Sequence, residues 1–261
     1  MLNEILIITG VVSLISAVIA GTVLARRITR PLVKTMEATK EIADGNYRIR
    51  FESSTGMKEL SELTRSVNHM AQSLDEQEKL RRISGLVADM ESLRQLEDEK
   101  MVLEKEPLNL LEIAGAVKQS FEREASERGL EMVVLGEAAV ISGDRKRLHQ
   151  AVYNLVSNAV KYTGDRGKVT ITVRRTEQGA SISVEDSGIG IVESELPFIF
   201  ERFYRTDSSR SRKTGGSGIG LTIVKAIVKA HNGNIEVTSR QGKGSCFTVT
   251  LPEECREAGG K

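Results

Sequence analysis

Asn154-Leu-Val-Ser-Asn158-Ala-Val-Lys161-Tyr162 is the segment of this 261-residue chain from which its fold class can be argued. Its polar residues are separated by four, three and one, so on a helix they gather along one face. An Asn carbonyl is a hard oxygen ligand for Mg²⁺, and Lys161 supplies positive charge for phosphate oxygens. The segment predicts a helix suited to a Mg-triphosphate, although an ordinary amphipathic surface helix would show a similar pattern. The apolar positions that recur at helical spacing are Leu148, Val152, Leu155, Val156 and Ala159.

A second motif, Val184-Glu185-Asp186-Ser187-Gly188-Ile189-Gly190, follows an alternating, strand-like run over 180–184. A carboxylate at a strand end can accept a hydrogen bond from an adenine amino group, and the glycines let the backbone approach the base closely. We therefore predict that Asp186 recognises adenine through this hydrogen bond. The alternative is a plain Asp-Ser-Gly turn between a strand and a helix.

A third motif, Thr214-Gly215-Gly216-Ser217-Gly218-Ile219-Gly220-Leu221, leads into a helical apolar pattern. Glycines before a helix expose amide hydrogens and the positive end of the helix dipole to phosphates. A dinucleotide-binding loop is disfavoured because a polar, basic stretch over 205–213 precedes the glycines instead of a strand. The phosphate loop of nucleoside triphosphatases is excluded because the chain contains neither Gly-Lys-Ser nor Gly-Lys-Thr.

Between the second and third motifs, Pro197-Phe198-Ile-Phe200-Glu-Arg202-Phe203-Tyr204-Arg205 concentrates four of the ten aromatic residues beside two arginines. In order and spacing, the four blocks resemble the N, G1, F and G2 boxes of histidine-kinase ATP-binding domains, over residues 106–255. The resemblance implies a Bergerat (GHKL-type) α/β sandwich, in which helices cover one face of a mixed sheet and the nucleotide lies beneath a lid, here 208–216.

The resemblance also implies the roles of individual residues toward ATP and Mg²⁺. Asn158 would ligate the metal, Lys161 and Tyr162 would contact the phosphate side, and Asp186 would hold adenine. Arg205 would contact the γ-phosphate, with Arg202, Arg210 and Arg212 as neighbouring competitors. The remaining residues assigned to the pocket are Asn154, Gly188, Gly190, Gly216, Gly218 and Gly220.

Asn154 bears on the reaction type. Related ATPases such as gyrase and heat-shock chaperones have a glutamate there, which activates water as a general base. An amide cannot accept that proton. The sequence thus predicts transfer of the γ-phosphoryl group to a protein acceptor, in which positioning and charge neutralisation do most of the catalysis.

Residues 5–25 form an uncharged stretch long enough, at about 1.5 Å per residue, to cross a hydrocarbon core of about 30 Å. Arg26, Arg27, Arg30 and Lys34 follow, so the positive-inside rule predicts a single-pass anchor in the plasma membrane lipid with cytoplasmic C-terminal domains. A cleaved signal peptide is the alternative, disfavoured because no positive segment precedes the apolar run. Only four residues lie ahead of it, so we do not expect a sensory domain there.

Residues 26–79 resemble a HAMP signal relay, in which two helices flank an extended connector. The second helix carries a heptad-like seam. The resemblance implies a parallel four-helix bundle to which each chain contributes two helices, and therefore a homodimer. The alternative is a membrane-proximal coiled coil without a signalling role. The seam residues are Leu60, Leu63, Val67, Met70 and Leu74.

The segment 80–105 resembles the second helix of the dimerisation and phosphotransfer hairpin of these kinases. The first helix, which should bear a histidine followed by an acidic residue, is missing between Arg82 and Ile83. None of the three histidines, His69, His149 and His231, has that context, and no proline follows a threonine. The pattern therefore predicts one long helix over 58–103 and no phosphoacceptor in this chain.

Taken together, the sequence resembles a sensor histidine kinase that is truncated at its N-terminus and lacks its acceptor helix. It predicts ATP-dependent phosphoryl transfer to a protein histidine with impaired self-phosphorylation. Two alternatives stay open: a regulatory subunit that pairs with an intact histidine kinase, and a serine kinase of the anti-sigma-factor type. A response regulator or an intact kinase is the expected partner. The net charge of +1 gives no reason to expect nucleic acid, and residues 256–261 are predicted to be a frayed tail.

Overall fold

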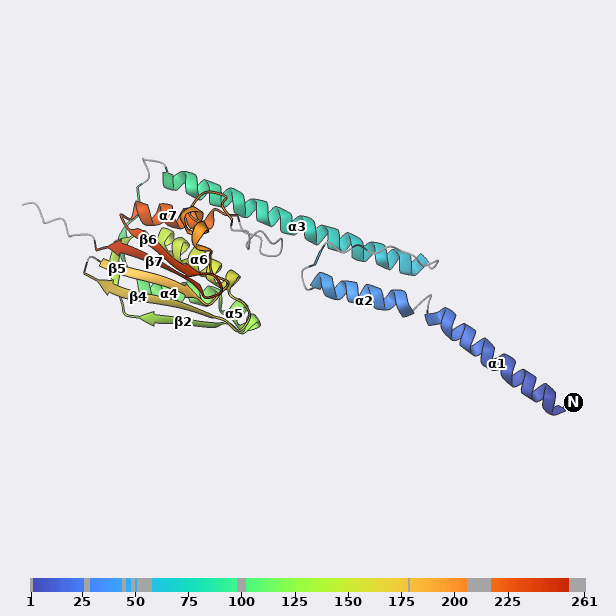
Figure 1. Ribbon diagram of the computed structural model, residues 1–261. Helices are drawn as coiled ribbons and strands as arrows, with labels where there is room; N and C mark the ends of the chain where they lie inside the picture. Colours follow the sequence, from blue (N-terminus) through green and yellow to red (C-terminus); the bar gives the residue numbers. More distant parts are fainter. Residues whose placement is uncertain are drawn as a thin grey trace, which may run out of the picture. The chain divides into compact units, whose positions relative to one another are not determined.

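The computed structural model describes residues 2–25, 29–43, 46–47, 50, 58–97, 102–177, 179–205 and 217–253 (Figure 1). The chain divides into two compact units, Met1–Ser84 and Gly85–Lys261.

The N-terminal unit contains helix α1 (Leu2–Leu24), helix α2 (Arg30–Ala43) and the first part of helix α3 (Lys58–Glu97). Among the described helices, α1 is the one long and apolar enough to cross a membrane, with a mean hydropathy of 2.3 over Ile7–Leu24. Its side chains from Ile7 onward are exposed. This is the apolar stretch that the sequence predicts as an anchor.

Helices α2 and α3 share a small apolar cluster formed by Ile42, Val67 and Ala71, with Tyr47 and Leu74 packed against it. Two residues of the predicted seam, Leu63 and Met70, remain 42% and 55% exposed. Only part of the seam therefore packs within the chain.

Helix α3 runs without interruption through Arg82 and Ile83 to Glu97. The prediction of one long helix is confirmed to that residue, while residues 98–101 lie outside the described part of the chain. Its C-terminal portion belongs to the second unit, where Leu93 enters the main core and Leu86 and Leu96 pack against it.

The C-terminal unit is built on a five-stranded mixed sheet with the order β2-β4-β5-β7-β6. Strands β2 and β4 are parallel and the other neighbours are antiparallel. Separately, β1 pairs with β3. The bounds are β1 Glu106–Asn109, β2 Glu131–Gly136, β3 Val140–Gly143, β4 Lys168–Thr176, β5 Gly179–Asp186, β6 Asn234–Arg240 and β7 Gly244–Pro252.

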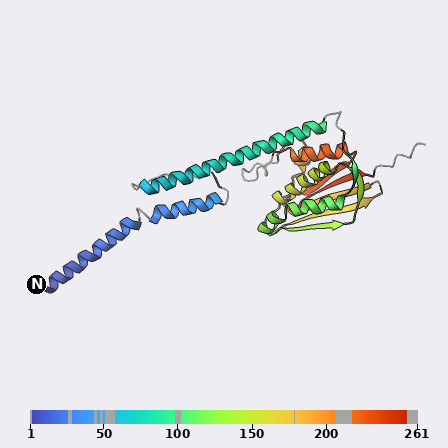
Figure 2. The ribbon, with the colours of Figure 1, turned by 180° about the vertical axis from the view of Figure 1, so that it is seen from behind.

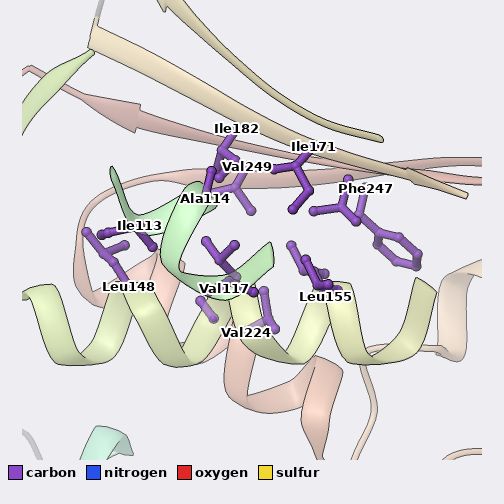
Figure 3. Packing of buried hydrophobic residues seen from close by; sticks show 14 of the residues in the cluster. Ile113, Ala114, Val117, Leu148, Leu155, Ile171, Ile182, Val224, Phe247 and Val249 are labelled. Atoms are coloured by element: carbon purple, nitrogen blue, oxygen red, sulfur yellow. The ribbon is translucent and has the colours of Figure 1, made fainter. Parts of the chain in front are cut away.

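Helices α4, α6 and α7 cover one face of this sheet (Figures 1 and 2), because strand residues with period two point a continuous apolar face toward them. Figure 3 shows Leu155 of α6 facing Ile171 and Phe247 of the sheet, whereas Leu148 lies beside Ile113 of α4. Each such side chain contributes roughly 1.5–3 kcal/mol on burial. The predicted α/β sandwich is confirmed. The helical bounds are α4 Leu110–Ser120, α5 Glu122–Arg128, α6 Arg145–Tyr162, the 3₁₀ helix η2 Glu193–Phe198 and α7 Gly220–Ala230.

His231 has a structural role at the end of α7. The imidazole is 4% exposed, its Nδ1 lies 2.8 Å from the carbonyl oxygen of Ile227, and the Asp144 backbone N–H donates to its Nε2 at 3.0 Å. Nδ1 must then carry the proton, so the ring is neutral and fully engaged. The other two histidines lie within helices, His69 in α3 and His149 on α6 itself.

Candidate functional site

A cavity of about 290 Å³ lies where α6, the end of β5 and the start of α7 meet. Helix α6 begins after Asp144, whose side chain caps it by accepting the Arg147 N–H at 3.0 Å. One face of α6 is buried in the core, and the opposite face supplies five polar side chains to the cavity wall. Four of them, Asn154, Asn158, Lys161 and Tyr162, are those that the 3.6-residue period predicts, and the fifth is Ser157.

Asp186 is the last residue of β5 and lies in the wall of the same cavity, 8% exposed. Burial raises the pKa of its carboxyl above the ordinary 3.8, while hydrogen bonds from the backbone N–H groups of Gly188 and Ser245 oppose the shift. The Gly188 N–H donates to Oδ1 at 2.8 Å. This geometry fixes the carboxylate in one orientation toward a ligand.

Gly188 is predicted to shape the pocket, and it does so indirectly, since it is not among the residues that line the cavity. A Cβ added at this position would lie 2.7 Å from Asp186 Oδ1 and would collide with the carbonyl oxygen of Tyr162. Gly188 therefore permits the close approach of the strand end to the end of α6. Gly190, by contrast, lines the cavity and has a φ of +65°.

The glycine-rich loop enters α7 through Gly218 and Gly220, both of which line the cavity. Gly218 has a φ of +72°, and an added Cβ would lie 2.9 Å from the carbonyl carbon of Phe203. The Asn154 amide donates through Nδ2 to the Gly220 carbonyl oxygen at 3.3 Å, which ties α6 to the loop. Gly216 and the predicted lid over 208–216 lie outside the described residues.

Arg205 and Tyr204 bring the aromatic segment into the cavity wall. Arg202 does not line it, so of the two arginines in this segment the structure brings Arg205 to the site. Arg210 and Arg212 lie outside the described residues. Phe198 and Tyr204 pack with ring centroids 5.8 Å apart, which anchors the segment beside the cavity.

Two polar residues of the cavity wall, Asp89 and Ser245, lie outside the sequence motifs. Asp89 projects from α3 into the cavity wall and accepts a hydrogen bond from Ser217 Oγ at 3.1 Å. Its only sequence signal is a charged residue within the apolar stripe Leu86, Leu93 and Leu96. The apolar part of the wall, which includes Ile189, Ile191, Ile199 and Phe247, is suited to a planar base.

The fold and the cavity define a GHKL-type domain, and comparison with known proteins agrees. The family described as "Histidine kinase-, DNA gyrase B-, and HSP90-like ATPase" matches residues 143–254. The HAMP domain family matches residues 23–76.

Sensor histidine kinase CusS of Escherichia coli K12 is 41% identical over 175 residues, which cover 67% of this chain and 36% of CusS. Signal transduction histidine-protein kinase BaeS of the same strain is 28% identical over 284 residues, covering 91% of this chain and 61% of BaeS. The BaeS comparison extends over more positions than this chain has residues, so BaeS contains residues there without a counterpart here.

Among solved structures, the catalytic domain of histidine kinase ThkA is 30% identical with a TM-score of 0.52, covering 58% of this chain and 97% of that domain. The mycobacterial sensor histidine kinase MprB is 32% identical with a TM-score of 0.52, covering 56% of this chain and 97% of the solved chain. The protein belongs to the sensor histidine kinase family. It spans about a third of the length of CusS.

Proposed function

We propose that this protein is a membrane-anchored member of two-component signalling that binds Mg-ATP and transfers the γ-phosphoryl group to a histidine of a partner protein. One observation carries the proposal: a single cavity gathers the polar face of α6, the Asp186 carboxylate and Arg205. The relatives named above are sensor histidine kinases, which disfavours the serine-kinase alternative.

The residues of the cavity divide into an adenine end and a phosphate end. Asp186 accepts a hydrogen bond from the adenine amino group, and the apolar wall around Ile189 and Phe247 covers the base. Lys161 and Arg205 supply positive charge to the phosphate oxygens. These residues hold and orient the nucleotide, which is the main contribution a protein makes to phosphoryl transfer.

The donor set fits Mg²⁺. Asn158 offers one hard amide oxygen in the same cavity as Lys161, and Mg²⁺ is usually bound through few protein ligands, with waters and phosphates completing its shell. When bound, the ion would supply charge neutralisation between phosphate oxygens.

Asn154 supports transfer over hydrolysis. Its amide nitrogen donates to the Gly220 carbonyl oxygen, so the side chain braces the loop, and an amide cannot take a proton from water. Because no histidine of the chain is followed by an acidic residue, we infer that the acceptor lies on another protein. An intact histidine kinase would supply that acceptor. A response regulator would act downstream, since a solved complex pairs ThkA with the response regulator TrrA.

We further propose that α1 is a single-pass anchor and that the relay helices form a homodimer. The uncharged, exposed length of α1 supports the anchor. Leu63 and Met70 of α3, together with Val33 and Met36 of α2, are exposed apolar side chains that a second copy would cover.

The test uses the full-length protein in detergent micelles with labelled ATP. The protein is incubated alone and with an intact histidine kinase whose own ATP site has been inactivated. We expect label on the partner's histidine and little label on this chain, and we expect Asp186→Asn to reduce the transfer strongly at ATP concentrations below saturation. Strong labelling of the chain alone would contradict the missing acceptor, and no label on either protein would refute the proposed transfer.

A further inference from the structure

The C-terminal part of α3 packs on the ATP-binding domain through one face that includes a carboxylate. Leu86, Leu93 and Leu96 contact the core from this face, and Asp89 lies on the same face at helical spacing. A charged residue among the apolar residues of this packed face loses part of its hydration. Its presence there requires a partner or a function.

Polar contacts hold this part of α3 against α6. Arg147 donates to Ser92 Oγ at 3.2 Å and to Gln95 Oε1 at 3.0 Å, and Gln150 donates to Ser92 Oγ at 3.1 Å. Because Ser92 and Gln95 lie within two turns of Asp89, these contacts fix how the carboxylate enters the cavity.

Asp89 engages the glycine-rich loop before α7, which is the proposed phosphate-binding segment. Ser217 Oγ donates to Asp89 Oδ2 at 3.1 Å, and the Ile219 backbone N–H donates to Ser217 Oγ at 3.2 Å. Asp89 and Ser217 both line the same cavity as Lys161 and Asn158. Burial raises the pKa of the Asp89 carboxyl, opposed by the Ser217 hydrogen bond, which agrees with its position in the cavity wall.

We propose that Asp89 is an internal anion that competes with the nucleotide phosphates at Ser217 and thereby links the docking of α3 to nucleotide occupancy. The Asp89 carboxylate accepts the hydrogen bond of Ser217 Oγ, just before α7, and a phosphate would need the same donor. Its negative charge also repels a triphosphate in a partly dehydrated cavity. By thermodynamic reciprocity, a triphosphate that weakens the Asp89–Ser217 contact also weakens α3 docking. The inference rests on the proposed nucleotide binding.

Calorimetric titration of the full-length protein in detergent micelles tests the inference with ATP and with adenosine. Asp89→Asn removes the charge and keeps the shape, so it should bind ATP about tenfold more tightly than the wild type and bind adenosine equally. Glu78→Gln is the matched control, because it removes the same charge from an exposed position on the same helix away from the cavity, and it should change neither affinity.

Hydrogen exchange provides the reciprocal measurement. ATP should accelerate amide exchange over residues 86–97, adenosine should not, and Asp89→Asn should abolish the ATP effect. Equal ATP affinities for the wild type and Asp89→Asn would overturn this inference alone, as would an equal gain for adenosine. Failure of all three proteins to bind ATP would overturn the proposed function and this inference with it.

Discussion

Replacing Asp186 with asparagine perturbs the proposed adenine end of the site with little change in volume. In the wild type, Oδ1 accepts the Gly188 N–H at 2.8 Å, and the Ser245 N–H also donates to the carboxylate. Asparagine offers one acceptor oxygen, which Gly188 retains. Its NH₂ group then faces the adenine amino group, so two donors oppose each other.

The cost follows from the loss of a hydrogen bond to a charged, buried acceptor. Such bonds contribute about 1.5–3 kcal/mol, so we expect ATP to bind roughly ten- to a hundredfold more weakly. The amide NH₂ can instead donate to the O6 of guanine. Binding of ATP should therefore weaken more than binding of GTP, so the ratio of the ATP affinity to the GTP affinity should fall.

Titration of ATP and GTP into wild type and variant, monitored calorimetrically, measures both quantities. Glu185→Gln provides the control, since it is the adjacent residue of β5, carries the same charge and is exposed on the other side of the strand. An ATP affinity for Asp186→Asn within threefold of the wild type would refute the reasoning. Equal losses for ATP and GTP would indicate general damage to the cavity.

Asn158→Ala should remove most of the Mg²⁺ dependence of ATP binding, measured as the ratio of affinities with magnesium and with EDTA, and an unchanged ratio would contradict its role as a ligand. Gly218→Ala should weaken ATP binding about tenfold or more and lower the melting temperature, because a left-handed non-glycine residue costs about 1–2 kcal/mol and its Cβ would press on Phe203. Gly242→Ala, which has a similar positive φ but open space around it, should show the strain without the loss of binding. Ile223→Ala, at a fully buried position of α7, should lower the free energy of unfolding by about 2–5 kcal/mol in chemical denaturation, and a loss below 1 kcal/mol would contradict tight packing there. Burial raises the folded-state pKa of Asp89 above 3.8. Its protonated form therefore contributes stability that is present below pH 3.8 and lost as the pH rises through the raised pKa. Asp89→Asn should flatten that part of the profile of urea-denaturation stability against pH.

The boxes that carry the site could be predicted because each is a local pattern. The apolar period of 3.6 over 148–160 places Asn154 and Asn158 on the face opposite the core, wherever the helix packs. Strand alternation ends at Asp186, which puts a carboxylate at the end of a strand followed by a turn of small residues. Such patterns depend on neighbours within about five residues, so they can be detected in the sequence alone.

The relay seam is a feature whose packing partners the sequence pattern does not determine. Its heptad spacing is evident from the sequence, yet Val67 packs against Ile42 while Leu63 and Met70 remain exposed. The spacing specifies that one face of the helix is apolar. It does not specify which of those residues meets a helix of the same chain.

The sequence by itself determined the polar face of α6, the position of Asp186 at the end of a strand and the continuity of α3 through Ile83, and its resemblance to histidine-kinase ATP-binding domains predicted the mixed α/β sandwich. Only the tertiary structure decided that Gly188 supports the cavity from behind and that Asp89 reaches Ser217 from a helix 128 residues earlier in the chain. The physical reason is that secondary structure follows from steric and hydrophobic periodicity among near neighbours. A contact between distant residues depends on how whole faces pack, and no local period records that packing.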